Sequence, residues 1–211
     1  MNKIFVILTA LILSGCATKL TQLNVPTQLE YNGKHYVLTG SQDLGTIARY
    51  AYISKPDTLE NWQSEIEILF DRNQPARSIK ERIALRERIY RNTGVKDFHF
   101  DAIPENSTNP NELNGYVIYS PTKENPSWQV NVMKGRQLSQ CGFVQFQYSQ
   151  KIQQPTRSKH LSVNKVQRHL QKYIVDIERN HLQNLEWQPL CENECRSKSR
   201  HILLEQIRCI R

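Results

Sequence analysis

Apolar and polar residues alternate along several short segments of this chain, and this period of two constrains the fold more than any other feature. Ile66, Ile68 and Phe70, for example, alternate with acidic side chains. Such alternation is typical of a strand that buries one face. Strand patterns recur at residues 97–102, 116–119, 128–132 and 143–148. The connections between them are short and rich in Pro, Asn and Gly, which predicts an antiparallel meander with one buried face.

The dipeptide Asn32-Gly33 predicts the first hairpin of this meander. It is the pair best suited to a tight type I′ turn, and strand-like residues at 29–31 and 35–38 flank it. The segment that follows, 46–53, is apolar and aromatic, and its pattern is compatible with either a strand or a helix.

A first helix is predicted at about 78–93. Ser78 and Glu81 have the spacing of a capping box, and Gly94 stands where the glycine that ends a helix is usually found. Arg86 interrupts the apolar face of this helix. We expect Arg86 at the edge of that face, with its charge extended towards solvent.

The second predicted helix covers 162–181, with Ser162 as a suitable N-cap. An apolar stripe runs along one face, and the opposite face is basic. Such a helix is able to lie on a membrane surface, but we expect its stripe to pack on the sheet. The stripe consists of Val163, Val166, Leu170, Tyr173, Ile174 and Ile177, and the basic face of Lys165, Arg168, Lys172 and Arg179.

The order of strands, helix, strands and helix predicts an α+β fold, in which two helices pack on one face of an antiparallel sheet. The 211 residues suit one domain of ordinary size. An apolar content of 38% and a charged content of 23% are typical of a globular chain and exclude a disordered one. No apolar run approaches the roughly 20 residues of a spanning helix, so any membrane attachment must come from the N-terminus.

The first sixteen residues have the organisation of an export signal. Lys3 is followed by the apolar run 4–13, which is too short to span a membrane as a mature helix, and small residues precede Cys16. The tetrapeptide Leu13-Ser14-Gly15-Cys16 resembles the lipobox of bacterial lipoproteins at every position. The resemblance implies a diacylglycerol on the Cys16 thiol, cleavage before Cys16 and acylation of its amine. Ala17 in place of Asp favours the outer membrane in that family.

These features divide the chain into four expected regions. The signal peptide covers 1–15, a lipid anchor and tether 16–27, an α+β domain 28–187, and a cysteine-containing tail 188–211. The tether is short, with a reach of roughly 35 Å from the lipid when extended. We therefore expect the domain to sit near the membrane surface.

Four cysteines remain after Cys16 has been assigned to lipid. An even number in an exported chain indicates disulfides, which would tie the tail to the domain, but the three possible pairings stay open. The competing interpretation is that Cys191, Cys195, His201 and Cys209 bind zinc, but their spacing resembles no common zinc finger. The disulfide candidates are Cys141, Cys191, Cys195 and Cys209.

The best candidate for an active site is the segment Asp97-Phe98-His99-Phe100-Asp101. In a strand its three polar side chains project on one face, where a histidine between carboxylates could bind a metal or act as a general base. The other interpretation is a solvent-facing side opposite two buried phenylalanines. Motifs of serine hydrolases, zinc proteases and nucleotide-binding loops are absent from the sequence, so we expect no catalytic residue, metal or cofactor.

These observations predict a lipid-anchored, non-catalytic envelope protein that serves as an accessory subunit of a secretion, conjugation or surface assembly. A protein partner in the envelope is expected. One alternative is an anchored hydrolase or metal-dependent enzyme that uses Asp97, His99 and Asp101. Another is a binder of anionic lipid or cell-wall polymer, because the net charge is +8. Nucleic acid is not an expected partner of an exported chain.

Overall fold

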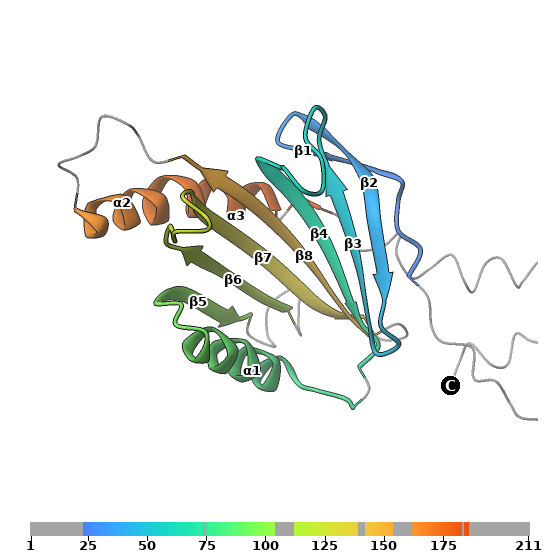
Figure 1. Ribbon diagram of the computed structural model, residues 1–211. Helices are drawn as coiled ribbons and strands as arrows, with labels where there is room; N and C mark the ends of the chain where they lie inside the picture. The colour runs from blue at the N-terminus through green and yellow to red at the C-terminus, as the bar shows by residue number, and fades with distance from the viewer. Residues whose placement is uncertain are drawn as a thin grey trace, which may run out of the picture.

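The computed structural model describes residues 23–73, 75–103, 112–138, 142–153, 162–182 and 184–185, without the side chains of residues 163 and 173. Its centre is one eight-stranded antiparallel sheet in the order β1-β2-β3-β4-β8-β7-β6-β5 (Figure 1). The strands are β1 (Gln28–Tyr31), β2 (Lys34–Asp43), β3 (Ile47–Ile53), β4 (Ser64–Asp71), β5 (Asp97–Ala102), β6 (Glu112–Tyr119), β7 (Trp128–Leu138) and β8 (Gly142–Ile152).

The sheet consists of two four-stranded meanders that meet in the middle. Strands β1–β4 follow one another along the chain, as do β5–β8, and β4 pairs with β8 in antiparallel register, with Ile68 opposite Phe146. Helix α1 (Ile79–Asn92) carries the chain from the end of β4 to the far edge, where β5 begins. The antiparallel sheet and the α+β class predicted from the alternation are confirmed.

The predicted first hairpin is confirmed as well. Tyr31 of β1 pairs with Lys34 of β2, and the two residues between them adopt positive φ values of 48° at Asn32 and 70° at Gly33. A type I′ turn requires this backbone at both central positions. The segment left open between strand and helix forms β3, because its apolar residues pair with those of β4 on the buried face of the sheet.

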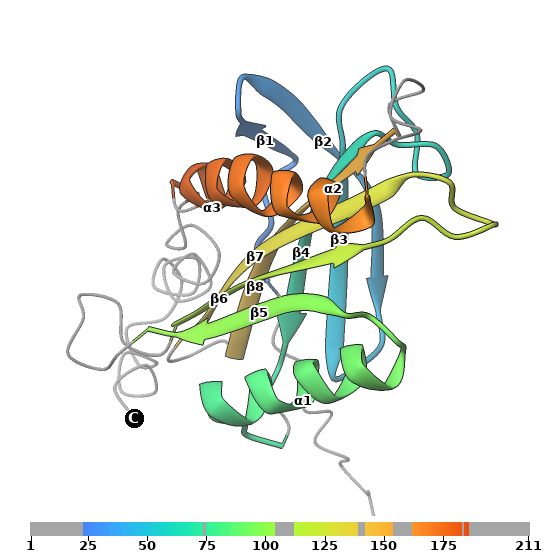
Figure 2. The ribbon, with the colours of Figure 1, turned by 90° about the vertical axis from the view of Figure 1, so that its left-hand side faces the viewer.

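The two helical segments cover opposite faces of the sheet, so the prediction that both pack on one face was wrong (Figure 2). Neighbouring residues of β6 show the reason. Ile118 belongs to the core that contains Leu170 of the second helical segment, whereas Val117 belongs to the core against which Ile79 of α1 packs. Strands β7 and β8 repeat this arrangement. Nearly continuous apolar runs bury both faces of a sheet and require a cover on each.

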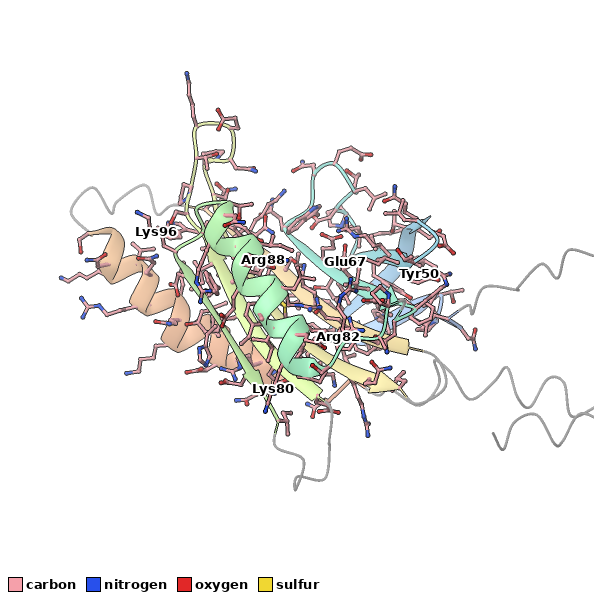
Figure 3. The ribbon with its side chains drawn as sticks, turned by 90° about the horizontal axis from the view of Figure 1, so that it is seen from below. Tyr50, Glu67, Lys80, Arg82, Arg88 and Lys96 are labelled. Carbon is pink, nitrogen blue, oxygen red and sulfur yellow. The ribbon has the colours of Figure 1, made fainter. Side chains whose placement is uncertain are left out.

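Helix α1 has the predicted capping box. The Ser78 hydroxyl accepts a hydrogen bond from the Glu81 amide, and the Glu81 carboxylate accepts one from the Ser78 amide. The expected position of Arg86 was wrong, because its guanidinium turns towards the sheet and donates to Gln145 at 2.7 Å. Burial lowers the pKa of Arg86 to about 10. Arg82, one turn earlier, also points from α1 towards the sheet (Figure 3).

The second predicted helix is a continuous helical segment with a π-helical middle. It consists of α2 (Val163–His169), the π-helical segment η1 (Leu170–Val175) and α3 (Asp176–Leu182). Ser162 is the N-cap residue, but its side chain makes no cap hydrogen bond. A π-turn adds one residue per turn and rotates the following residues around the axis. Val175, Glu178 and Leu182 are therefore buried after Leu170, whereas Ile177, which was assigned to the stripe, is 50% exposed.

Part of the expected tether belongs to the folded domain. Leu23 lies in the main core, and the Tyr52 hydroxyl donates to the carbonyl of Pro26 at 2.8 Å. The segment 23–27 is thus not a free linker. All five cysteines and the tail 188–211 lie outside the described residues, so lipidation at Cys16 and the disulfides stay predictions. Within the described part of the chain, no helix is long and apolar enough to cross a membrane.

Candidate functional site

A cleft of about 730 Å³ opens at one end of the sheet. The turn from α1 to β5 supplies Thr93 and Gly94, and the start of α2 supplies Asn164. The connection from β6 to β7 supplies Ser120, Pro121, Thr122, Asn125 and Ser127. In Figure 2 the α1–β5 turn and the β6–β7 connection lie at the same end of the sheet. Three segments that are far apart in the sequence thus meet at this cleft.

Neutral hydrogen-bonding side chains dominate the lining of the cleft. Four aliphatic hydroxyl groups come from Thr93, Ser120, Thr122 and Ser127, and four carboxamides come from Asn125, Gln129, Asn164 and Gln167. Two hydrogen bonds across the tip of the β6–β7 connection hold the loop in a compact turn: the Thr122 amide donates to the Asn125 carbonyl, and the Asn125 amide donates to the Thr122 hydroxyl. A hydroxyl both donates and accepts, and a carboxamide has separate donor and acceptor atoms. The cleft is therefore able to bind a ligand that carries donors and acceptors side by side.

Three charged residues complete the lining, two lysines and one aspartate. Lys96 and Asp97 stand at the start of β5, and Lys151 stands near the end of β8. The Lys151 ammonium lies 4.1 Å from the centre of the Trp62 ring, close enough for a cation–π contact. This contact fixes Lys151 at the rim of the cleft.

Only Asp97 of the predicted segment lines this cleft. The three polar side chains do share one face of β5, opposite Phe98 and Phe100, which pack in the core beneath α1. His99 and Asp101 are more than half exposed and bond to each other, with Nε2 and Oδ1 2.9 Å apart. Neither of them lines the cleft, so the three residues do not form one site.

Asp97 is the first member of a row of hydrogen bonds between β5 and the second helical segment. Burial raises the pKa of Asp97, and a hydrogen bond from the Tyr116 hydroxyl lowers it. The Tyr116 hydroxyl in turn accepts a hydrogen bond from Gln171 of η1. Asp101 of the same strand makes a second contact with the helical segment, because one of its carboxylate oxygens lies 3.8 Å from a guanidinium nitrogen of Arg179. These contacts fix the Asp97 carboxylate at the edge of the cleft.

The described residues contain no group of three histidine, cysteine or acidic side chains that could hold a metal ion. Asp97 has hydroxyl and amide neighbours in the cleft, and both lysines belong to its lining. Such a set of groups is able to bind and orient a polar ligand. Asp97, His99 and Asp101 are not arranged as ligands of one metal ion, so the geometry does not support the hypothesis of a metal-dependent enzyme.

Sequence reasoning identified Asp97 but missed the other residues of the cleft. Gln129 alternates with apolar residues, and Lys151 follows two polar residues near the end of a strand pattern, so both look like ordinary solvent-facing positions. Asn164 and Gln167 look like the polar side of an amphipathic helix. No local signal marks any of them, because the cleft is produced by the long-range meeting of strand ends with α2.

The comparisons with known proteins identify a family. A protein-family model matches residues 23–187. A protein from Haemophilus influenzae, described as an uncharacterized protein, is 95% identical over 192 residues, which are 91% of this chain and all of the relative. A solved structure of a mutant of protein Mog1 has a TM-score of 0.37 and 13% identity, over 74% of this chain and 87% of that one. The chain belongs to the family that the matching model describes.

Proposed function

We propose that this family member is a lipid-anchored protein of the cell envelope and acts as a non-catalytic accessory subunit of an envelope assembly. Cys16 would carry the lipid, the outer membrane is the expected location, and the domain would bind a protein partner. The observation that carries the proposal is the position of the folded N-terminal segment relative to the cleft and α2.

The N-terminal segment and the cleft lie on different sides of the domain. Residues 23–27 run beside β1 and β2, at one end of the strand order, whereas β5 and the β6–β7 connection lie towards the other end (Figure 1). Because Leu23 is anchored in the core, a lipid on Cys16 would hold the β1–β2 side of the domain towards the membrane. The side with α2 and the cleft would then face away from that membrane.

The second helical segment, which runs from the cleft at α2 to β1 at α3, carries groups that suit a protein interface. Ile177 of α3 is 50% exposed, whereas Leu170, Val175 and Leu182 of the same helical segment are buried. Exposed Lys165 and Arg168 stand on the preceding turns. An exposed apolar side chain with charged neighbours provides contact area in the middle and polar groups at the rim. This arrangement favours a protein partner that binds the exposed face of the second helical segment.

Metabolic labelling with palmitate tests the anchor. The full chain should incorporate label, and Cys16→Ser should abolish it, because the thiol is the acceptor of the diacylglycerol. Cys141→Ser is the matched control and should keep the label. Persistent labelling of Cys16→Ser would disprove the anchor.

Photo-crosslinking in cells tests the partner. A photo-reactive residue at Ile177 should give a protein adduct, whereas the same residue at Thr39 of β2, on the membrane side of the proposed orientation, should not. Adducts at Thr39 alone would reverse the orientation. Absence of protein adducts from Ile177, in cells where the protein is folded and labelled with palmitate, would refute the accessory role.

A further inference from the structure

We propose that the cleft between the α1–β5 turn, the β6–β7 connection and α2 is a binding site for an uncharged oligosaccharide. This inference goes beyond the accessory role, and it does not depend on the lipid anchor. The volume of the cleft, about 730 Å³, lies within the roughly 300–1,000 Å³ of ordinary ligand sites. The ligand class follows from the chemistry of the lining.

A sugar ring presents neighbouring hydroxyl groups, each of which both donates and accepts. The cleft offers the matching groups, because carboxamides of Gln129, Asn164 and Gln167 line it together with the hydroxyls of the β6–β7 connection. A carboxamide has an acceptor oxygen and a donor nitrogen side by side, so it is able to accept from one sugar hydroxyl and donate to its neighbour. Gln129 is also oriented, since its side-chain nitrogen donates to Asn131 at 2.9 Å and leaves its oxygen as an acceptor.

The charges fit a neutral ligand better than a strongly anionic one. Lys96 and Lys151 are balanced in part by Asp97, and the Lys151 ammonium already lies over the Trp62 ring. The Asp97 carboxylate is able to accept hydrogen bonds from two adjacent sugar hydroxyls. An anionic polymer would have to bring its own charges close to this carboxylate.

An extended peptide is a less suitable occupant. Peptides that add to a sheet use a free strand edge. Strands β6, β7 and β8 are each paired on both sides, and β5, whose outer edge is free in the described sheet, contributes only its first residue, Asp97, to the lining. Peptides that bind through side chains need deep apolar pockets, and energetic hot spots are enriched in large aromatic residues. Tyr119 is the one aromatic residue in the described lining, beside the small apolar contributions of Val95, Ile118 and Pro121.

The test is a binding titration with the full chain purified in detergent. The probes are chitotetraose, which carries acetamide groups, and cellotetraose, which carries only hydroxyls. Binding of either tetrasaccharide at millimolar concentration or below is expected, and tighter binding of chitotetraose would show that the carboxamides recognise acetamide groups. Failure of both to bind would overturn the proposal.

Two variants locate the binding. Asn164→Ala and Asp97→Ala should each weaken binding of the better probe by about tenfold or more, the effect of losing about 1.4 kcal/mol. Asn180→Ala, an exposed asparagine of α3 outside the lining, is the matched control and should bind normally. Thermal unfolding of each variant confirms that it is folded. Unchanged affinity in both folded cleft variants would place the sugar elsewhere and refute the assignment.

Competition distinguishes the alternatives. The competitors are a short peptide and anionic phospholipid vesicles. The carbohydrate assignment would be overturned if one of them displaced the tetrasaccharide from the wild-type cleft and also lost more affinity than the sugar does in Asn164→Ala. Because Cys16→Ser leaves the cleft intact, it should bind the tetrasaccharide as the wild type does. The anchor and the sugar site are thus tested by separate results.

Discussion

Arg82 of α1 donates to the Asp71 carboxylate at the end of β4 over 2.6 Å, and only 3% and 9% of the two side chains are exposed. The Arg82 guanidinium also lies 4.2 Å from the centre of the Phe143 ring, and it donates a second hydrogen bond to Asn73. This pair connects the helix that carries the crossover to the centre of the sheet. It fixes how α1 lies on the face that the helix covers.

Removal of Asp71 should be costly, because it leaves a charged guanidinium buried without its carboxylate. We expect Asp71→Asn to lower the free energy of unfolding by about 3–5 kcal/mol, measured by urea denaturation. Adding Arg82→Met to Asp71→Asn should recover part of this loss of stability, since the methionine keeps the contact with Phe143 without a charge. A double variant as unstable as the sum of the two single variants would contradict this account.

The Glu87–Arg91 pair is the matched control on the same helix. Its nitrogen and oxygen are 2.8 Å apart, but Arg91 is largely exposed. Exposed pairs of this kind contribute roughly 0–1 kcal/mol. Arg91→Met should therefore change the free energy of unfolding by less than about 1 kcal/mol in the same denaturation experiment.

Because of the π-helical segment η1, we expect different losses of stability when two residues of the predicted apolar stripe are replaced. Leu170→Ala should destabilise the protein by about 2–5 kcal/mol, because this side chain is buried in the main core. Ile177→Ala should change stability by about 0.5 kcal/mol or less, since exposed positions are tolerant. Chemical denaturation of both variants measures the difference. Equal losses of stability in the two variants would mean that the helical segment has no π-turn.

A buried carboxyl group makes the stability depend on pH. The Tyr31 hydroxyl donates to Glu178 of α3 at 2.7 Å, and His181 Nδ1 and Lys34 are the basic groups near it. Burial raises the pKa of Glu178 above 4.5, although Tyr31 and the two basic groups oppose this shift. The folded chain thus holds this proton more tightly than the unfolded chain does.

A raised carboxyl pKa gives stability that is fully present below the ordinary pKa of 4.5 and is lost as the pH rises through the raised value. Glu178→Gln keeps an acceptor for Tyr31 and cannot ionise. At about pH 8 we expect it to be more stable than the wild type, since the wild-type carboxylate is ionised and buried there whereas the amide carries no charge. Thermal unfolding across pH, repeated in a His181→Gln background to remove the imidazole, measures the effect. A wild type with the same pH profile as Glu178→Gln would contradict it.

Local patterns in the sequence were sufficient to predict most of the secondary structure. The positive φ at Asn32 and Gly33 and the capping box at Ser78 depend on residues close together in the chain, and both were predicted correctly. Most strands were found because apolar residues alternate along them or form a short run, whereas 46–53 was left open between strand and helix. Such features need no knowledge of what packs against them.

Features that depend on distant contacts could not be predicted in this way. The sequence does not distinguish a helix that shares a face with another helix from one that covers the opposite face, although adjacent apolar residues such as Val117 and Ile118 indicate burial on both faces. The π-turn also leaves no simple mark, and it moves Ile177 out of the stripe. For the cleft, only Asp97 was identified, because the other polar residues resemble solvent-facing positions until the chain has folded.

The pH dependence of ligand binding gives a last prediction, which concerns Asp97. Burial raises its pKa above 3.8, and the hydrogen bond from Tyr116 acts in the opposite direction. As the pH falls through the raised value, the carboxylate gains a proton and loses an acceptor for a sugar hydroxyl. We therefore expect tetrasaccharide affinity to fall severalfold between about pH 7 and about pH 4.

Two variants show whether Asp97 is the group that titrates. Asp97→Asn should bind more weakly at neutral pH and show no pH dependence in this range. Tyr116→Phe removes the hydrogen bond that lowers the pKa of Asp97, so the loss of affinity should begin at a higher pH than in the wild type. Titration calorimetry at several pH values measures both effects. A pH profile that is unchanged in Asp97→Asn would assign the titration to another group and separate Asp97 from binding.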